Sequence, residues 1–496
     1  MTAAGGATGA TATPPALDTL GRVHLIGVGG AGMSAVALLL AARGVPVSGS
    51  DARDSAVLAA LREAGVRVHV GHDAAHVAGV HTVVVSSAIR ETNPELAAAR
   101  SGGLRVLHRS VALAALMAGR RTVAVAGAHG KTTTSAMVAA VLVAAGRDPS
   151  YAIGAAVDGP VGARPGAGDA FVAEADESDG SFLAYAPEVA VVTNVEPDHL
   201  DHYGTREAFE AAFVAFAGRI VPGGSLVACA DDDGARRLAA RVAADDVPVI
   251  TYGTAADAVV RMGPWVPAGE GGSVAVHDTR DGTRAVLELQ VPGAHNGLDA
   301  AAAWTAARLL GVPSDVAVDA LAGFRGTGRR FEARGERGGV RVVDDYAHHP
   351  TEVAALLRAA RTVAGNGRVL VLFQPHLYSR TRTFAREFAE ALATADLAVV
   401  TDVYAAREDP DPTVTGALIT EAMPAGRGLH VPGRLEAATQ LGRRARPGDL
   451  VLTVGAGDVT ELAPVVLAAV GTGDGGAAAD GGPAGGPRDG GPAVGR

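Results

Sequence analysis

Short runs of β-branched apolar residues alternate with alanine-rich stretches of helical length along most of the chain. The first run is Val23-His24-Leu25-Ile26, a helical stretch follows over residues 34–43, and Val45-Pro46-Val47 begins the next strand. The alternation starts again at residues 122–126 and a third time at residues 340–343. Strands that alternate with helices are typical of parallel sheets covered by helices. The pattern predicts an α/β protein of three domains.

We place the domain boundaries near residues 120 and 324, the second at a Gly/Arg-rich stretch. Residues 21–119 and 324–470 then form Rossmann-like domains, and residues 120–323 form a central domain of the kind found in P-loop ATPases. A chain of 496 residues is long enough for several cores. Between residues 249 and 291, short strands separated by Gly and Asp turns predict an antiparallel edge, and therefore a mixed central sheet.

The two ends of the chain have a different composition. Residues 1–20 contain Ala, Gly, Thr and Pro without a basic head and an apolar run, so they do not read as a secretory signal. Residues 471–496 are mostly Gly, Ala, Pro and Asp, with too few apolar side chains to offset the entropy of ordering. We expect both ends to be disordered tails, and no apolar stretch reaches the length of a membrane span.

Composition restricts the kinds of partner. A formal charge of −10 argues against a nucleic-acid-binding protein, because phosphate backbones are bound by clustered positive charge. The single cysteine, Cys229, excludes an internal disulfide framework and suits a reducing cytoplasm. Its flanking residues predict a buried strand, although a lone thiol is also a candidate nucleophile. Of the 43 Lys and Arg residues, only Lys131 is a lysine.

A glycine-rich turn follows the first predicted strand. Gly27, Gly29 and Gly32 make a G-x-G-x-x-G pattern that includes Gly30, and Asp51 ends the next strand. Such a turn lets the backbone approach a diphosphate at a helix N-terminus, while the acid accepts a ribose hydroxyl. Any nucleoside diphosphate satisfies the pattern, so it does not separate NAD from a UDP-sugar. A turn used for packing alone is the alternative.

A second glycine loop, residues 127–134, follows the strand at residues 122–126. The strict Walker pattern would require glycine at position 125, where Val125 stands, so this loop is a variant. Its chemistry is preserved, because backbone N–H groups cradle phosphates, Lys131 reaches the β and γ oxygens and Thr132 is a ligand for Mg²⁺. The loop predicts nucleotide binding.

Acidic residues follow the next predicted strands. Glu174 lies at the end of an apolar run and is expected at the same sheet edge as Lys131, where a second Mg²⁺ ligand would lie. His199 follows another such run, but Mg²⁺ prefers oxygen to imidazole. The residues alone leave the role of His199 open.

Taken together, these segments resemble the Mur ligases over almost everything between Val23 and Leu462. The resemblance is carried by residues 24–34, 128–134, 292–296, 326–331, 344–350 and 373–382. The chain departs from the family at Ala128, where threonine is usual, and at Asp299, where a second asparagine is common. Leu377 stands where some relatives carry arginine, which makes Arg380 the expected carboxylate partner.

The resemblance implies a role for each matching position. The UDP-sugar would be bound by Gly27, Gly29, Gly30, Gly32, Asp51 and Ser87. ATP would be bound by Gly127, Ala128, His129, Gly130, Lys131, Thr132, Thr133, His295, Asn296, Arg330 and Asp345. Magnesium would be held by Thr132, Glu174 and His199, and the amino acid by Tyr346, His348, His376 and Arg380. The implied catalytic residues are Lys131, Glu174, His199, Arg330 and His348.

Two positions bear on the details. His348 is a candidate general base, because imidazole titrates near working pH, but a structural histidine is the alternative. Several sister ligases need a carbamylated lysine after the Asp-His segment, and here the equivalent position is Phe213. Within the family, the alanine-adding branch usually lacks that lysine.

The activity implied is ATP-dependent ligation of an amino acid, L-alanine in that branch, to the lactyl carboxylate of UDP-N-acetylmuramate. An acyl phosphate is the implied intermediate, with ATP and two Mg²⁺ ions as cofactors. We expect a cytoplasmic monomer or weak homodimer that neither binds nucleic acid nor inserts into a membrane. Glycine or serine as the amine donor stays open.

Other functions are weighed against this one. An NAD-dependent oxidoreductase built on residues 27–51 would leave the loop around Lys131 unexplained. A non-catalytic nucleotide-binding regulator would bind ATP without substrate-stimulated turnover. Another muropeptide ligase, or a folate-polyglutamate ligase, would differ in the first-domain loop.

Overall fold

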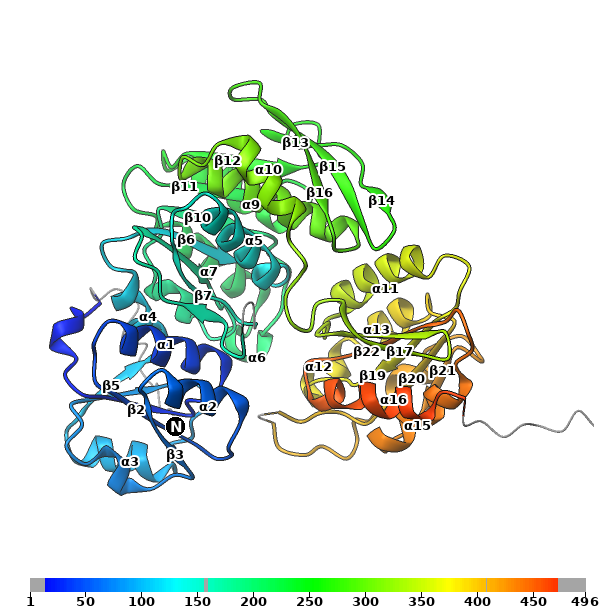
Figure 1. Ribbon diagram of the computed structural model, residues 1–496, viewed down its shortest axis with the longest axis horizontal. Coiled ribbons are helices and arrows are strands. Elements are labelled where there is room, and N and C mark those ends of the chain that lie inside the picture. The colour runs from blue at the N-terminus through cyan, green and yellow to red at the C-terminus, as the bar shows by residue number, and fades with distance from the viewer. Residues whose placement is uncertain (1–13, 156–158, 407, 472–496) are drawn as a thin grey trace, which may run out of the picture.

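The computed structural model describes residues 14–155, 159–406 and 408–471, and within these ranges the strands form three sheets (Figure 1). The N-terminal sheet is parallel, in the order β3-β2-β1-β4-β5. Its strands are β1 (Val23–Ile26), β2 (Val47–Asp51), β3 (Arg67–Val70), β4 (Thr82–Val85) and β5 (Arg105–His108). The helices are α1 (Ala31–Ala42), α2 (Ala56–Glu63), α3 (Pro94–Ser101) and α4 (Arg109–Met117), with 3₁₀ turns η1 (Leu17–Thr19) and η2 (Ala74–Val77).

The central sheet runs in the order β14-β15-β13-β12-β11-β10-β6-β9-β7-β8, with β16 paired to β15. Its strands are β6 (Arg121–Ala126), β7 (Ser150–Ala152), β8 (Ala163–Arg164), β9 (Ala170–Glu174), β10 (Val189–Val192), β11 (Ser225–Cys229), β12 (Val249–Gly253), β13 (Val260–Met262), β14 (Val266–Ala268), β15 (Gly271–Asp278) and β16 (Arg284–Leu289). The helices are α5 (Lys131–Ala144), α6 (Leu200–Tyr203), α7 (Arg206–Ala217), α8 (Asp233–Ala243), α9 (Ala294–Leu309) and α10 (Ser314–Ala322), with the 3₁₀ turn η3 (Ser181–Ala184).

Strands β6, β9, β10 and β11 are mutually parallel and almost wholly buried. Their continuous Val and Ala runs are typical of strands covered on both faces. Strands β13 to β16 pair antiparallel, as the turn-rich pattern between residues 249 and 291 predicts. Parallel neighbours bring their carboxyl ends to one edge, so the loops after β6, β9 and β10 meet there.

The C-terminal sheet has the order β17-β18-β22-β19-β20-β21. Its strands are β17 (Glu332–Arg337), β18 (Val340–Asp345), β19 (Val369–Phe373), β20 (Leu397–Val400), β21 (Gly428–His430) and β22 (Leu450–Val454). The helices are α11 (Pro350–Ala364), α12 (Tyr378–Thr383), α13 (Ala385–Leu392), α14 (Ala417–Thr420), α15 (Arg434–Arg444) and α16 (Ala463–Ala469), with the 3₁₀ turn η4 (Asp458–Leu462). Strand β17 pairs antiparallel to β18 at the sheet edge. The sequence did not indicate it, because its largely polar residues are mostly exposed.

The domains contact one another in two different ways. One continuous apolar cluster runs from the N-terminal domain into the central domain and includes Leu40 of α1 and Leu142 of α5. The C-terminal domain has its own apolar clusters, one on each face of its sheet. In Figure 1 it lies to the right of the N-terminal domain and below strands β14 and β16 of the central domain. Its contacts with the central domain include the polar groups described below.

The ends of the chain differ in part from expectation. Residues 14–20 belong to the predicted N-terminal tail, but Leu17–Thr19 form a 3₁₀ turn and Leu20 is fully buried in the core. Residues 1–13 and 472–496, the rest of the predicted tails, lie outside the described residues. Across the described parts of the chain, each helix is too short or too polar to span a bilayer.

Candidate active site

The loop between β6 and α5 forms the turn predicted for phosphate binding. Gly127 and Gly130 have φ angles of 136° and 81°, which side chains other than glycine rarely adopt. A Cβ on Gly130 would lie 2.6 Å from Oδ1 of Asp299, and one on Gly127 would overlap the hydroxyl of Thr193. Helix α5 begins directly afterwards at Lys131, so its N-terminal N–H groups face the loop, an arrangement that favours anions.

The ammonium of Lys131 is held at this loop. Nζ donates to the carbonyl oxygens of Gly127 at 2.6 Å and Ala128 at 3.3 Å, and lies 2.9 Å from Oε2 of Glu177. Burial lowers the pKa of Lys131, but the carboxylates of Glu177 and Glu174 outweigh burial and raise it above its usual value. Lys131 is therefore charged, and nucleotide phosphates would offer it the same kind of anionic partner.

Glu174 lies where the sequence predicts, at the sheet edge next to the phosphate loop. It pairs in register with Val125 of β6, and its Oε2 accepts hydrogen bonds from the Thr132 hydroxyl at 3.0 Å and the Gly154 N–H at 2.7 Å. A hydroxyl and a carboxylate in contact are oxygen donors of the kind that Mg²⁺ prefers. The two side chains thus suit a magnesium ion beside the phosphates.

His199 borders the same cavity, close to carboxylates. Its Nε2 lies 3.6 Å from Oε1 of Glu177 and 3.6 Å from Oδ2 of Asp198, and its φ is +53°. Burial lowers the pKa of His199 to about 4. The imidazole is therefore neutral near pH 7, the form in which a histidine ligates a metal.

One cavity joins the residues that the sequence assigns to separate substrates. It runs from the phosphate loop to the C-terminal domain and also touches Ala31 at the start of α1. The predicted site residues along it are Ala128, His129, Gly130, Lys131, Thr132, Glu174, His199, Arg330, Tyr346, His348, His376 and Arg380. The residues predicted to bind phosphate, metal and the amino acid thus line one cavity.

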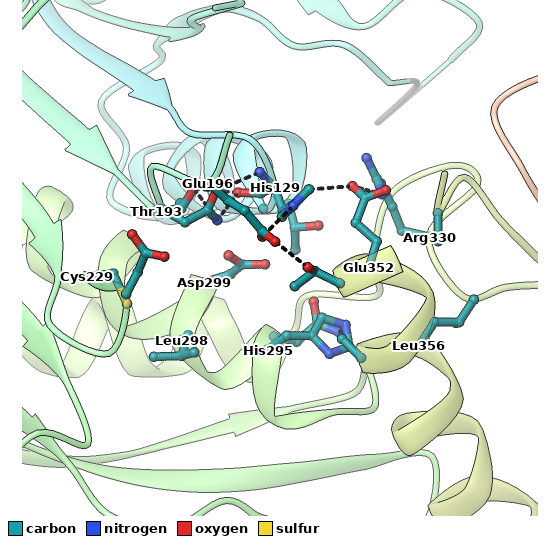
Figure 2. A pocket seen from close by; sticks show the side chains of 18 of the residues that line it. His129, Thr193, Glu196, Cys229, His295, Leu298, Asp299, Arg330, Glu352 and Leu356 are labelled. Atoms are coloured by element: carbon teal, nitrogen blue, oxygen red, sulfur yellow. Dashed lines mark hydrogen bonds and ion pairs between the residues drawn. The ribbon is translucent and has the colours of Figure 1, made fainter. Parts of the chain in front are cut away.

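A second cavity continues from the phosphate loop to the residues expected around the adenine base of ATP (Figure 2). His129, Gly130 and Arg330 border both cavities. The further predicted residues that line the second one are Thr133, His295, Asn296 and Asp345. Apolar surface from Leu298 and Leu356 and the thiol of Cys229 complete a space that suits a flat base. Burial raises the pKa of Cys229 to about 12, so its thiol is not an activated nucleophile.

Arg330 and Asp345, both predicted to bind ATP, are held by contacts at the start of the C-terminal domain. The guanidinium of Arg330 lies 5.3 Å from the ring centroid of Tyr346 and 3.9 Å from Oε1 of Glu352. Asp345 accepts backbone N–H bonds from Phe331 at 2.9 Å and Ala347 at 2.8 Å. Burial raises the pKa of Asp345 to about 6.

Arg380, the expected carboxylate partner, is paired with a side chain of the central domain. Its Nη2 lies 3.0 and 2.9 Å from the two carboxylate oxygens of Asp198, and both side chains are buried. A substrate carboxylate would have to share or replace this partner. His376 lies beside Arg380, and its ring stacks on Tyr404 at 5.8 Å between centroids.

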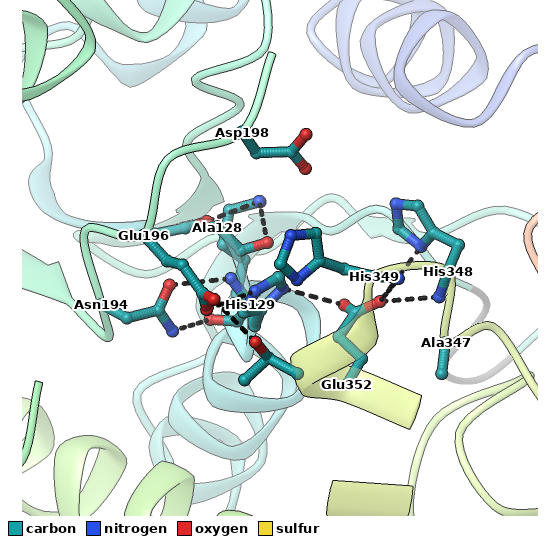
Figure 3. A network of polar contacts seen from close by, with 12 residues as sticks. Ala128, His129, Asn194, Glu196, Asp198, Ala347, His348, His349 and Glu352 are labelled. Atoms are coloured by element: carbon teal, nitrogen blue, oxygen red, sulfur yellow. Dashed lines mark hydrogen bonds and ion pairs between the residues drawn. The ribbon is translucent and has the colours of Figure 1, made fainter. Parts of the chain in front are cut away.

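The N-terminus of α11 meets the phosphate loop through Glu352 (Figure 3). Its Oε2 accepts the backbone N–H groups of His348 at 2.8 Å and His349 at 3.2 Å, and its Oε1 lies 3.3 Å from Nδ1 of His129. The ring of His348 also contacts Glu352, with Nδ1 3.2 Å from Oε2. Burial raises the pKa of Glu352, but His348 and His129 outweigh burial and lower it well below the usual value.

In the N-terminal glycine turn, the carboxylate of Asp51 binds the backbone of the turn. Oδ2 of Asp51 accepts the N–H of Gly29 at 2.9 Å, and Gly27 has a φ of +77°. A side chain on Gly32 would collide with Arg109. Burial raises the pKa of Asp179 in the central domain, but side-chain hydrogen bonding, first from Ser181 and also from Ser87, outweighs burial and lowers it.

Comparison with known proteins identifies the chain. Models of the Mur ligase catalytic, middle and glutamate-ligase domains match residues 22–121, 125–307 and 329–457. A UDP-N-acetylmuramate–L-alanine ligase of Kineococcus radiotolerans is 61% identical over 455 residues, 90% of this chain and 96% of that protein. The chain belongs to the Mur ligase family. The ligase of the same name from Renibacterium salmoninarum is 57% identical over 92% of this chain and 97% of its own.

Solved Mur ligase structures share the fold. A crystal structure of a UDP-N-acetylmuramate-alanine ligase from Thermotoga maritima has a TM-score of 0.76 at 29% identity, over 90% of this chain and 98% of that one. A murein peptide ligase from Psychrobacter arcticus has a TM-score of 0.68 at 25% identity, over the same shares of each chain.

In this Mur ligase, Phe213 is a core residue rather than a polar site residue. It is fully buried in α7, and its ring lies 5.4 Å from Phe182 and 5.1 Å from Phe209, measured between centroids. The aromatic packing leaves no place for a charged side chain at this position.

Several site residues of this Mur ligase, Glu177 among them, have no counterpart in the sequence prediction. Glu352 and Asp198 form ion pairs between the central and C-terminal domains, and Tyr252 lines the second cavity. A glutamate three residues after the N-cap, with proline at the first helical position, is a signal for a helix start. The order His349, Pro350, Glu352 therefore indicated that Glu352 caps the N-terminus of α11. For Asp198, only its place among acids after a buried strand gave a signal.

Proposed function

We propose that this chain joins L-alanine to the lactyl carboxylate of UDP-N-acetylmuramate, with ATP hydrolysed to ADP and phosphate. The observation that carries the proposal is the cavity at the phosphate loop, which reaches Ala31 of the N-terminal domain and Arg380 of the C-terminal domain. An enzyme that couples three substrates needs such a meeting point. The high identity to ligases of this name over most of the chain supports the choice of substrates.

The reaction proceeds in two steps. A carboxylate oxygen of the sugar attacks the γ-phosphorus of ATP, the bond to the β–γ bridging oxygen breaks, and ADP leaves as an acyl phosphate forms. The alanine amine then attacks the acyl carbon, the C–O bond to phosphate breaks, and the amine proton passes to a base. The products are an amide, ADP and inorganic phosphate.

Positioning and charge neutralisation do most of the work in phosphoryl transfer. Lys131 and Arg330 are charged and border the phosphate region, where they stabilise negative charge on the transferring oxygens. Thr132, Glu174 and His199 would hold magnesium, which would neutralise phosphate charge, and we propose two ions. His348 is the proposed base, because its ring borders the cavity and contacts Glu352.

Further parts of the proposal concern the setting of the enzyme. The glycine turn at residues 27–32, with Asp51 and Ser87, binds the UDP-sugar, and Tyr346, His376 and Arg380 bind the amino acid. The protein works in the cytoplasm as a monomer or weak homodimer.

The test is phosphate release with ATP and Mg²⁺, adding UDP-N-acetylmuramate and then alanine, glycine or serine. Full turnover requires all components, alanine gives the highest kcat/KM, and the UDP product gains the mass of one amino-acid residue. Phosphate release that ignores the UDP-sugar, or a product without added mass, would show that the chain is not this ligase.

A further inference from the structure

Two histidines and a glutamate converge where the central domain meets the C-terminal domain (Figure 3). His129 comes from the phosphate loop, Glu196 from the segment after β10, and His349 directly precedes α11. Their ligand atoms all lie within 4.8 Å of one another, and the two imidazole centroids are 4.7 Å apart. The three side chains form what we call the His₂Glu cluster.

His349 is buried without the hydrogen bonds that a buried imidazole needs. Its exposed fraction is 3%, and among the described residues neither ring nitrogen has a hydrogen-bond partner. The ring faces the start of α11 as in a capping box, but it makes no side-chain hydrogen bond there. A buried polar group without a partner is costly, so the position calls for a ligand to the ring.

The other two members of the cluster are oriented by neighbouring side chains. Oε1 of Glu196 accepts the hydroxyl of Thr351 at 2.7 Å, which leaves Oε2 beside Nε2 of His129 at 3.1 Å. Glu352 lies 3.3 Å from the opposite nitrogen of His129. Glu352 contacts this nitrogen as an ion pair without a hydrogen bond, and a carboxylate behind a histidine is the usual support of a metal-ligating imidazole.

The donor set decides which ion suits the cluster. Two imidazoles and one carboxylate are typical ligands of zinc and similar first-row ions, whereas Mg²⁺ prefers oxygen. We propose that the His₂Glu cluster binds a divalent transition ion of the zinc class, separate from the magnesium ligands Thr132 and Glu174. Because His349 belongs to the C-terminal domain and the other ligands to the central domain, the bound ion fastens the two domains together.

The site is tested with Co²⁺ as the probe, added to the full chain in excess Mg²⁺ without nucleotide. The expected result is one Co²⁺ per chain with the strong visible absorption of a four-coordinate ion, displaced by Zn²⁺. Glu196→Gln and His349→Gln should each weaken binding at least about tenfold. Glu174→Gln, the same change at a proposed magnesium ligand, and His72→Gln, in a histidine group around Glu95 of the N-terminal domain, should leave the signal unchanged.

Folding of each variant is checked by circular dichroism. If His349→Gln does not fold, Glu196→Gln alone tests metal binding, because the Glu196 side chain is 33% exposed and its replacement should be tolerated. Zn²⁺ should also reduce the radius of gyration of the wild type in X-ray scattering and leave that of Glu196→Gln unchanged. Unaltered Co²⁺ binding by Glu196→Gln would overturn the proposal, as would loss of the signal in Glu174→Gln or His72→Gln.

Discussion

The ammonium of Lys131 lies so close to the phosphate loop that a larger cationic group would not fit there. Its Nζ already contacts two backbone carbonyls and Glu177. Because the guanidinium of arginine is planar and wider, we expect Lys131→Arg to fold normally and to lose turnover by about 10²- to 10³-fold, the usual cost of a displaced transition-state donor. Phosphate release with all substrates measures the loss. The reverse change Arg164→Lys, at an exposed ion pair with Asp148, should have little effect, and near-normal turnover of Lys131→Arg would contradict the role.

Asp299 gives a second prediction at the residue scale. Burial raises its pKa to about 7, and the Thr134 hydroxyl, which donates at 2.9 Å, offsets part of this effect. Since the folded state holds the proton more tightly than the unfolded state, the contribution to stability is complete below pH 4 and is lost as the pH rises through about 7. Asp299→Asn keeps an acceptor for Thr134 and removes the buried charge.

We therefore expect Asp299→Asn to unfold at about the same temperature as the wild type near pH 4 and at a higher temperature at pH 8. The gain corresponds to a few kcal/mol at most, at roughly 1.4 kcal/mol per pKa unit. Thermal unfolding across this pH range measures it, with Asp54→Asn at the exposed pair with Arg62 as the control. A difference between the proteins that does not vary with pH would contradict the explanation.

Individual residues could be assigned from the sequence where their chemistry is local. Lys131, Thr132 and Glu174 come together because parallel strands end at one edge, and this could be predicted. The pairing of Arg380 with Asp198 could not, because the two residues are 182 positions apart and their contact depends on how two domains meet. The same reason hides His349 as a neighbour of His129.

At the scale of elements, helix α7 is held by aromatic packing. Phe213 lies among Phe182, Phe209 and Phe216, which a smaller side chain would leave with a cavity. We expect Phe213→Ala to lower the free energy of unfolding by about 3–5 kcal/mol, and Phe213→Leu by about 1.5 kcal/mol or less. Denaturant unfolding followed by circular dichroism measures both. Equal effects of the two changes would contradict the packing argument.

Elements with a strong periodic pattern could be predicted, and edges could not. The alternation located β1, β6 and β18, and the turn-rich stretch located the antiparallel β15 and β16. Strand β17 is exposed at a sheet edge, where apolar side chains are not needed, so no pattern indicated it. Leu20 was assigned to a tail because Leu17 and Leu20 alone give no extended periodicity.

At the scale of the whole molecule, the N-terminal and central domains share an apolar core, while Arg380 and Asp198 form a buried ion pair between the central and C-terminal domains. Removing one charge of a buried pair costs about 3–5 kcal/mol. We expect Asp198→Asn to move the C-terminal domain outward, with a larger radius of gyration in X-ray scattering and a loss of turnover. Asp148→Asn, at an exposed pair, is the control. Unchanged scattering would show that the pair does not hold the domains.

The single lysine also gives the chain an unusual chemical labelling pattern. Within residues 1–496, Lys131 is the one lysine that a reagent acylating amines can label, and its side chain is 14% exposed and paired with Glu177. If the proposed ATP site is right, an acylating nucleotide analogue brings its reactive group to Lys131, and intact-mass spectrometry reports occupancy of that site as one added label. Trypsin would still cut the chain at its arginines, and the labelled peptide would be the one that contains residue 131.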